Sequence, residues 1–186
     1  MALIDKIDHA PLQSMYRYWL GLRPAGRRMP ARSQIRPEDI PALLPHLFLV
    51  DVLPQTRDSQ KGDSRTGRRY RLRLVGTHIA EHMGTSLTGR YLEEIATGAL
   101  YDRYRHFFDA VATGPAVHYL ASELYWRNRD WMMYRRLLLP LSDDDRTVNM
   151  LLGAGFYELR DSLDDGLRRL DETVTMHELE NELQPL

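Results

Sequence analysis

Strand-like segments on either side of a helical middle constrain the fold of this chain more than any other feature. Residues 46–53 are a continuous apolar run, and residues 69–76 alternate between basic and apolar side chains, as a strand with one buried face does. Three more strand-like segments follow at 116–126, 130–141 and 147–159. Two strands before a helical insert and three after it predict an α+β fold, a five-stranded antiparallel sheet with helices on one face.

Two segments with helical spacing flank this predicted sheet. The N-terminal segment, 12–22, carries apolar residues at the spacing of an amphipathic helix: Leu12, Tyr16, Trp19 and Leu20. The C-terminal segment, 159–175, carries a short apolar seam: Leu159, Leu163, Leu167, Leu170 and Val174. The chain is therefore expected to comprise an N-terminal helix with a connecting segment (1–35), a core (36–158) and a C-terminal helical tail (159–186).

The middle of the chain is expected to be helical, with polar connections on both sides. Residues 77–84 suit a short helix with Thr77 as its N-cap and Gly84 as its stop. A longer helix over 99–114 has an inner face made of Leu100, Tyr104, Phe107, Phe108 and Val111. Residues 54–67 predict a long hairpin loop, and the polar triplet at 127–129 predicts a tight turn.

Composition excludes several kinds of chemistry and of partner. The chain has no cysteine, so disulfides, thiolate metal sites, iron–sulfur clusters and cysteine nucleophiles are impossible. Its 25 basic and 26 acidic residues give a net charge of −1 and no overall electrostatic case for binding nucleic acid. No apolar run has the length of a membrane span, and no signal-peptide pattern opens the sequence, so a cytoplasmic location is expected.

A histidine motif raises the alternative of a small zinc hydrolase. His78, Glu81 and His82 fit the H-x-x-E-H pattern, in which two imidazoles hold the metal and the carboxylate activates water. The predicted helix is barely two turns long, however, and no third ligand is evident, so we favour an ordinary helix surface. The acidic run at 142–145 predicts a turn between strands in preference to a magnesium site.

The order of elements and several motifs together resemble the PAS fold, and more narrowly a bacterial family of stand-alone PAS proteins. The resemblance is carried by "YWLGLRPAGRRMPARSQIRPEDIPALLPHLFLVDV" (18–52), by "RLVGT" and "MGTSLTGRYLEEI" around residues 73–95, and by "LLLPLSDDDRTVNMLLG" (137–153). It implies a sensor or docking module with a cleft between small helices and a sheet. Members of such families hold haem, flavin, a small acid or nothing known, and often dimerise through flanking helices.

The resemblance directs attention to a cleft between the long helix and the sheet. Candidate cleft residues are Tyr104, Phe107, Phe108, Tyr119, Met133, Arg135 and Met150. The alternative is that these aromatic and methionine side chains only pack the core. Of the neighbours Arg135 and Arg136, one must point inward, and an inward arginine needs an anionic partner from the chain or from a ligand.

No catalytic motif remains, so a non-enzymatic signalling protein is expected. The first hypothesis is a sensor whose cleft takes a small-molecule ligand and shifts the flanking helices, in a homodimer that signals to a protein partner. The second is an interaction adaptor without a ligand, and the third is the zinc hydrolase. No cofactor is predicted, although the resemblance places His106 on the helix that supplies the iron ligand in haem-binding relatives.

Overall fold

Most of the described helices are short. The structure is a computed structural model that describes residues 2–54, 67–125, 131–159 and 170–175. Its α-helices are α1 (Leu3–Lys6), α2 (Ala10–Gly21), α3 (Thr77–Met83), α4 (Leu92–Ile95) and α5 (Gly98–Thr113). Three 3₁₀ helices, η1 (Arg32–Gln34), η2 (Pro37–Asp39) and η3 (Pro41–His46), lead from α2 into the sheet. The loop predicted at 54–67, apart from its end residues, and the triplet at 127–129 lie outside the described residues.

One antiparallel sheet contains all the described strands. These are β1 (Leu47–Pro54), β2 (Arg68–Val75), β3 (Ala116–Tyr125), β4 (Trp131–Leu141), β5 (Met150–Leu159) and β6 (Leu170–Thr175). Their order across the sheet is β2-β1-β5-β4-β3-β6. The two strands before and three after the helical insert are thus confirmed, and the α+β class with them.

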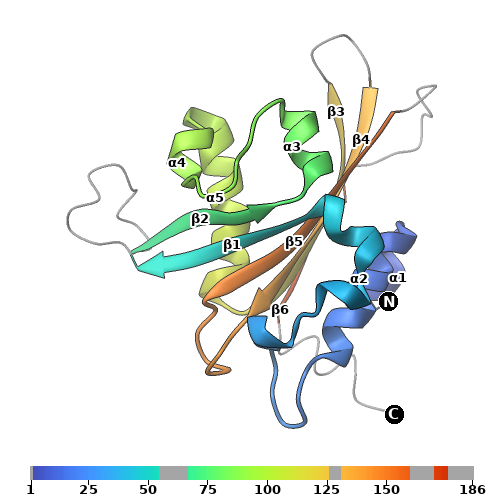
Figure 1. Cartoon of the computed structure of the whole chain (residues 1–186), viewed down its shortest axis with the longest axis vertical. Helices are drawn as coiled ribbons and strands as arrows, with labels where there is room; N and C mark the ends of the chain where they lie inside the picture. The colour runs from blue at the N-terminus through green and yellow to red at the C-terminus, as the bar shows by residue number, and fades with distance from the viewer. Residues whose placement is uncertain (1, 55–66, 126–130, 160–169, 176–186) are drawn as a thin grey trace.

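Helices cover the two faces of this sheet in different ways. Figure 1 shows α4 and α5 on one side of the sheet and α1 and α2 on the other. We call the side with α3, α4 and α5 the helical face and the other side the outer face. On the outer face, Trp19 of α2 is fully buried, and its indole N–H donates to the carbonyl of Pro140 at 3.0 Å. The N-terminal helix predicted from its apolar spacing is therefore confirmed, and its apolar side is buried within the same chain.

The prediction of a C-terminal helix over 159–175 is wrong where the structure describes that segment. Leu159 ends β5, and residues 170–175 form β6, which pairs with β3 from Ala116↔Thr175 to Ala121↔Leu170. Without this pairing β3 would present a free row of backbone donors and acceptors at the edge of the sheet. The sequence of β6 ends in Thr-Val-Thr, whose β-branched side chains suit a strand. The rest of the predicted helix lies outside the described residues.

The start of α3 also differs in detail from its prediction. Gly76 stands in the N-cap position, and Thr77 is the first helical residue. A Cβ on Gly76 would lie 2.3 Å from the carbonyl oxygen of Pro45, so close backbone contact with η3 requires glycine here. Gly84 ends the helix with φ of 68°, a left-handed conformation, and this part of the prediction is confirmed.

Strand β2 departs from simple alternation at one residue. Leu49 pairs with Leu74 and Val50 with Leu72, so Arg73 is an extra residue in β2. Leu74 consequently leaves the side of Tyr70 and Leu72 and is 43% exposed. The alternation predicted for residues 69–76 therefore fails at its end.

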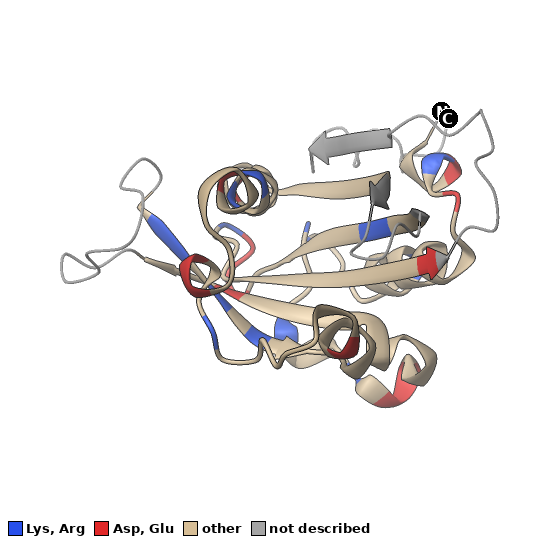
Figure 2. Ribbon diagram, turned by 90° about the horizontal axis from the view of Figure 1, so that it is seen from above, with Lys and Arg blue, Asp and Glu red and all other residues tan. Residues whose placement is uncertain are grey.

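The arginines of β2 bind carboxylates of the same chain. Asp51 is buried and accepts from Arg71 at 2.7 Å, and Arg73 pairs with its other oxygen at 3.3 Å. Arg69 pairs with Glu93 of α4. Figure 2 shows the basic bands of β2 in blue at one edge of the sheet. The exposed row expected from the sequence is thus largely neutralised within the chain.

The N-terminal segment packs into the same hydrophobic cluster as the sheet. Leu3, Ile7, Leu12 and Trp19 are fully buried and belong to one cluster with the strand residues. Within the described parts of the chain, no helix is both long enough and apolar enough to cross a membrane.

Candidate functional site

A cavity lies between the helices and the sheet on the helical face. Its volume is about 80 Å³, several times the roughly 10–15 Å³ that one ordered water needs. Its walls are mostly apolar side chains from β1, β2, β5 and the three helices. The lining residues are Phe48, Leu72, Val75, Ile79, Met83, Leu87, Leu92, Ile95, Ala96, Leu100, Tyr104, Phe108, Tyr134, Arg136 and Tyr157.

One cation, Arg136 of β4, belongs to this apolar lining. Its side chain is 1% exposed, and its guanidinium carbon lies 4.3 Å from the centre of the Phe107 ring. The Nε and Nη2 atoms have no hydrogen-bond partner among the described residues. Burying a cation with two unsatisfied donors is costly, because burial removes the water that would otherwise bind those N–H groups.

Two stacked tyrosines, Tyr134 and Tyr157, also line the cavity. The rings of Tyr134 and Tyr157 lie 4.7 Å apart, and His82 stacks on Tyr157 at 4.0 Å. Burial raises the pKa of Tyr134 to about 12, against an opposing effect of Arg136. Burial and the neighbouring Tyr134 raise the pKa of Tyr157 as well. Both phenols are therefore neutral near pH 7, and neither can act as a counter-charge for Arg136.

The structure brings together three of the seven predicted cleft residues. Tyr104 and Phe108 of α5 line the cavity, and Phe107 packs against Arg136 beside it. The placement of the other four on the helical face is wrong. Tyr119, Met133, Arg135 and Met150 are in the strand positions that face outward.

Alternation along the strands explains this division. Tyr134, Arg136 and Tyr157 line the cavity, so the residues beside them in β4 and β5 point to the outer face. The sequence indicated that one of the two neighbouring arginines points inward, and the inward one is Arg136. Alternation along a strand divides its residues between two faces of the sheet, but it does not indicate which face packs against the helices.

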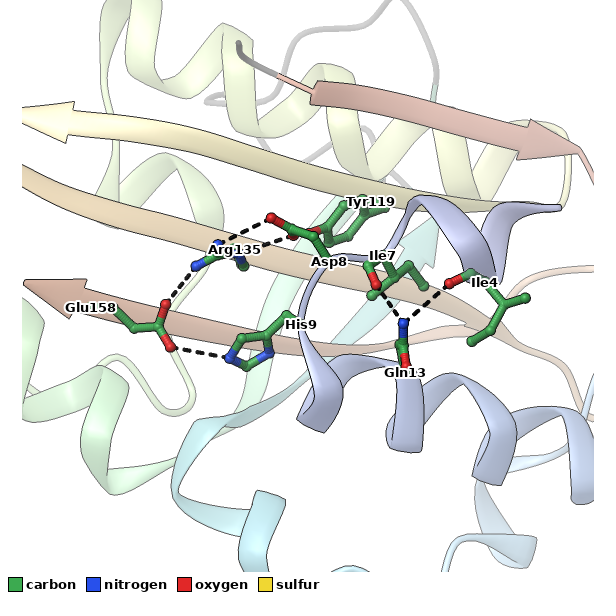
Figure 3. Close-up of polar contacts among 8 residues, drawn as sticks. All are labelled: Ile4, Ile7, Asp8, His9, Gln13, Tyr119, Arg135 and Glu158. Atoms are coloured by element: carbon green, nitrogen blue, oxygen red, sulfur yellow. Dashed lines mark hydrogen bonds and ion pairs between the residues drawn. The ribbon is translucent and has the colours of Figure 1, made fainter. Parts of the chain in front are cut away.

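Arg135 joins the sheet to the segment between α1 and α2 on the outer face. Its Nε and Nη2 atoms donate to the carboxylate of Asp8 at 3.0 and 3.1 Å, and its Nη1 pairs with Glu158 (Figure 3). Tyr119 also donates to Asp8, and Nε2 of His9 lies 3.3 Å from Glu158. Arg135 and Tyr119 lower the pKa of Asp8 against the opposing effect of burial. We call these five residues, Asp8, His9, Tyr119, Arg135 and Glu158, the outer polar cluster.

Two pairs of adjacent residues connect the outer polar cluster to the cavity, with one member of each pair in each site. In β4, Arg135 belongs to the cluster and Arg136 to the cavity lining. In β5, Glu158 belongs to the cluster and Tyr157 to the lining. A displacement of either strand at the cavity therefore also moves a residue that holds the N-terminal segment.

The histidines of the predicted metal motif do not converge. His78 lies 4.5 Å from the ring of His46, whereas His82 stacks on Tyr157. Among the residues that the structure describes, no group of three histidine, aspartate or glutamate side chains could hold a metal ion. His106 of α5 is exposed and does not line the cavity, so a haem in this cavity would not meet it.

The acidic run at 142–145 forms the bend between β4 and β5, as its sequence predicted. Asp144 accepts from the backbone N–H groups of Arg146 and Thr147, and these bonds lower its pKa. Asp145 accepts from the backbone N–H groups of Arg28 and Met29. The carboxylates of these two residues thus hold local backbone and the segment after α2.

A second hollow, which sequence reasoning missed, lies on the outer face beside β1 and β2. It has a volume of about 410 Å³ and is walled by residues of η1 to η3 together with Leu47, Leu49, Leu74 and Leu152. Leu44 and Leu74 on its rim are 39% and 43% exposed. Leu74 reaches this rim because of the extra residue in β2, which no local periodicity reveals.

Comparison with known proteins identifies a family for this chain. Residues 7–155 match a family model described as a PAS domain. No curated protein and no solved structure gives a match. The family match covers α2, β1 to β4, the first part of β5 and all the described helices on the helical face.

Proposed function

The chain belongs to the PAS domain family, and on this premise we propose that it is a sensor whose cavity takes a small ligand. Ligand occupancy would alter how firmly the outer polar cluster holds α1 and α2, and a protein partner would read that change. No step of this function requires catalysis.

The observation that carries this proposal is the pairing of cavity and cluster residues in adjacent positions. Arg136 and Tyr157 line the cavity, and Arg135 and Glu158 beside them bind Asp8 and His9. Closely packed strands transmit small displacements, because protein interiors have little free volume to absorb them. A ligand that moves β4 or β5 by a fraction of an ångström would change the geometry of the salt bridges on the outer face.

Filling the cavity with a side chain tests the coupling without a known ligand. Ala96 lines the cavity and is 5% exposed, so Ala96→Leu adds apolar volume there. We expect hydrogen exchange at the backbone amides of α1 and α2 to slow at least threefold, because a filled cavity stiffens β4 and β5. Ala110→Leu, on the same helical face but outside the lining, is the matched control and should leave those rates unchanged.

Exchange rates in α1 and α2 that are identical in Ala96→Leu, Ala110→Leu and the original chain would overturn the coupling. Native mass spectrometry of the purified chain, with an absorption spectrum, tests ligand binding separately. An extra bound mass supports the sensor. Bare polypeptide together with unchanged exchange rates would support the alternative, an interaction adaptor without a ligand.

The same mass spectrum reports the number of subunits. A homodimer through the flanking segments belongs to this proposal, as does a protein partner in bacterial signalling. Leu12, Met15, Tyr16 and Trp19 of α2 are buried against the sheet, so a dimer would use the other residues of α2. Its interface would need to bury about 1,200 Å² or more in total to be stable.

A further inference from the structure

We propose that the ligand of the cavity is a small carboxylic acid with an apolar body, held by Arg136. This inference rests on the proposed function and names the chemical class of its ligand. It begins from a cation that is 1% exposed and has two donors without partners among the described residues.

The Nε and Nη2 atoms of Arg136 have the geometry that binds a carboxylate. In a planar guanidinium, the Nε–H and the adjacent Nη2–H point in the same direction and form one edge of the group. A carboxylate binds such an edge with two parallel hydrogen bonds, one to each oxygen. The face of the guanidinium is already covered by Phe107 at 4.3 Å, so the in-plane edge is the part left for a partner.

Among the described residues, three carboxylates on α4 and α5 are already bound to other partners. Asp109, on the same helix as Tyr104, accepts from Tyr70 at 2.5 Å and pairs with Arg105 at 3.3 Å. Glu93 pairs with Arg69, and Glu94 accepts from the backbone of Tyr91. Tyr134 and Tyr157 are neutral near pH 7, because burial raises the pKa of each phenol.

The remaining walls suit the rest of such an acid. Ile79, Leu92, Ile95 and Leu100 present hydrocarbon, and Leu100 is 49% exposed at the rim, which gives a route for entry. The hydroxyl groups of Tyr134 and Tyr157 add neutral hydrogen-bonding partners. Mostly apolar walls with a few placed polar groups are typical of small-ligand sites. One cation among neutral groups favours a single negative charge.

Matched acids and amides test the inference directly. The probes are benzoate, phenylacetate and hexanoate, each compared with its own amide at equal concentration and ionic strength. We expect at least one acid to raise the Tm of the original chain by about 3 °C when in tenfold excess over its Kd. Its amide, which has the same shape without the charge, should bind at least tenfold more weakly.

Two neighbouring arginines provide the variants. Arg136→Met removes the donors but keeps an apolar side chain, and should abolish the effect of the acid. Arg136→Lys keeps the charge without the two-donor edge, and should weaken the acid at least tenfold. Arg135→Met, the adjacent residue on the outer face, should keep the preference for the acid over its amide, because the donors of Arg136 remain. Without ligand, Arg136→Met should keep or raise the Tm, because it removes a buried unpaired charge.

Three results would overturn the inference: equal effects of acids and amides, an acid effect that persists in Arg136→Met, or no effect of any acid. A fall in Tm of more than about 5 °C in ligand-free Arg136→Met would do so too, since it would reveal a partner within the chain. None of these results bears on the exchange rates in Ala96→Leu. The sensor proposal therefore stands or fails by its own test.

Discussion

Arg135 and Arg136 are adjacent in β4 and bind on opposite faces of the sheet. Arg135 donates to Asp8 at 3.0 and 3.1 Å, whereas Arg136 lines the cavity with its Nε and Nη2 unpartnered among the described residues. The charge of Arg135 is thus paired with a carboxylate of the N-terminal segment, whereas no described carboxylate binds these two atoms of Arg136.

Removing the outer arginine should loosen the N-terminal segment. Arg135→Met deletes the donors to Asp8 and Glu158, and we expect it to lower the free energy of unfolding by about 1–2 kcal/mol. The value is modest because Asp8 and Glu158 are about half exposed and regain water. Urea denaturation measures it, and Arg17→Met at an exposed position of α2 should stay within about 0.5 kcal/mol. Equal effects of the two changes would contradict this role.

Stability should fall on mild acidification. Burial lowers the pKa of His9, of His46 and of His82, so the unfolded chain takes up protons more readily than the folded chain. Above the unfolded pKa of about 6.5, these histidines are neutral in both states and do not reduce the free energy of unfolding. As the pH falls through that value, the unfolded chain binds protons first, and the free energy of unfolding decreases. Urea midpoints at pH 7.5 and 5.5 should therefore differ, with the lower midpoint at pH 5.5.

Replacing one histidine by an aromatic residue that does not titrate isolates its contribution to this pH dependence. His46 stacks on Phe156 at 4.0 Å, so His46→Phe keeps an aromatic ring there. The difference between the midpoints at the two pH values should become smaller in this variant. A difference that does not change would show that His46 contributes nothing to the acid sensitivity.

Two glycines should respond in opposite ways to alanine. At Gly76 the added Cβ would lie 2.3 Å from the backbone oxygen of Pro45, and we expect Gly76→Ala to cost about 3 kcal/mol or more. Around Gly21, at the end of α2, nothing lies within 4 Å of the added atom. There alanine should stabilise the chain by about 0.5 kcal/mol through helix propensity. Thermal unfolding of both variants measures this difference in stability. A similar loss of stability in Gly76→Ala and Gly21→Ala would contradict the prediction.

The phenol of Tyr70 should help to hold α5 against β2. It donates to Asp109 at 2.5 Å, and Tyr70→Phe should lower the free energy of unfolding by about 1–2 kcal/mol and speed amide exchange in α5. Tyr18→Phe removes two exposed hydrogen bonds with the backbone of Arg36, one donated and one accepted by the hydroxyl, and should cost less than about 0.5 kcal/mol. Chemical denaturation and hydrogen exchange measure both changes. Unaltered exchange in α5 of Tyr70→Phe would rule out this anchoring.

The sequence by itself determined the features that arise from local patterning. Apolar runs and alternation gave the first five strands, since burial of one face selects residues two apart. Helical spacing gave α2 and the inner face of α5, where Tyr104, Phe107 and Phe108 were identified as cleft candidates. It also required that one of two adjacent arginines point inward.

Only the tertiary structure decided the features that depend on a neighbour. The edge of β3, which is distant in sequence, makes residues 170–175 a strand, although the spacing of their leucine and valine suggested a helix. The extra residue in β2 moves Leu74 to the outer face. The phase of β4 against α5 sends Arg136 to the cavity and Arg135 to Asp8. Alternation in a strand is symmetric between the two faces, and only the elements packed on each face remove that symmetry.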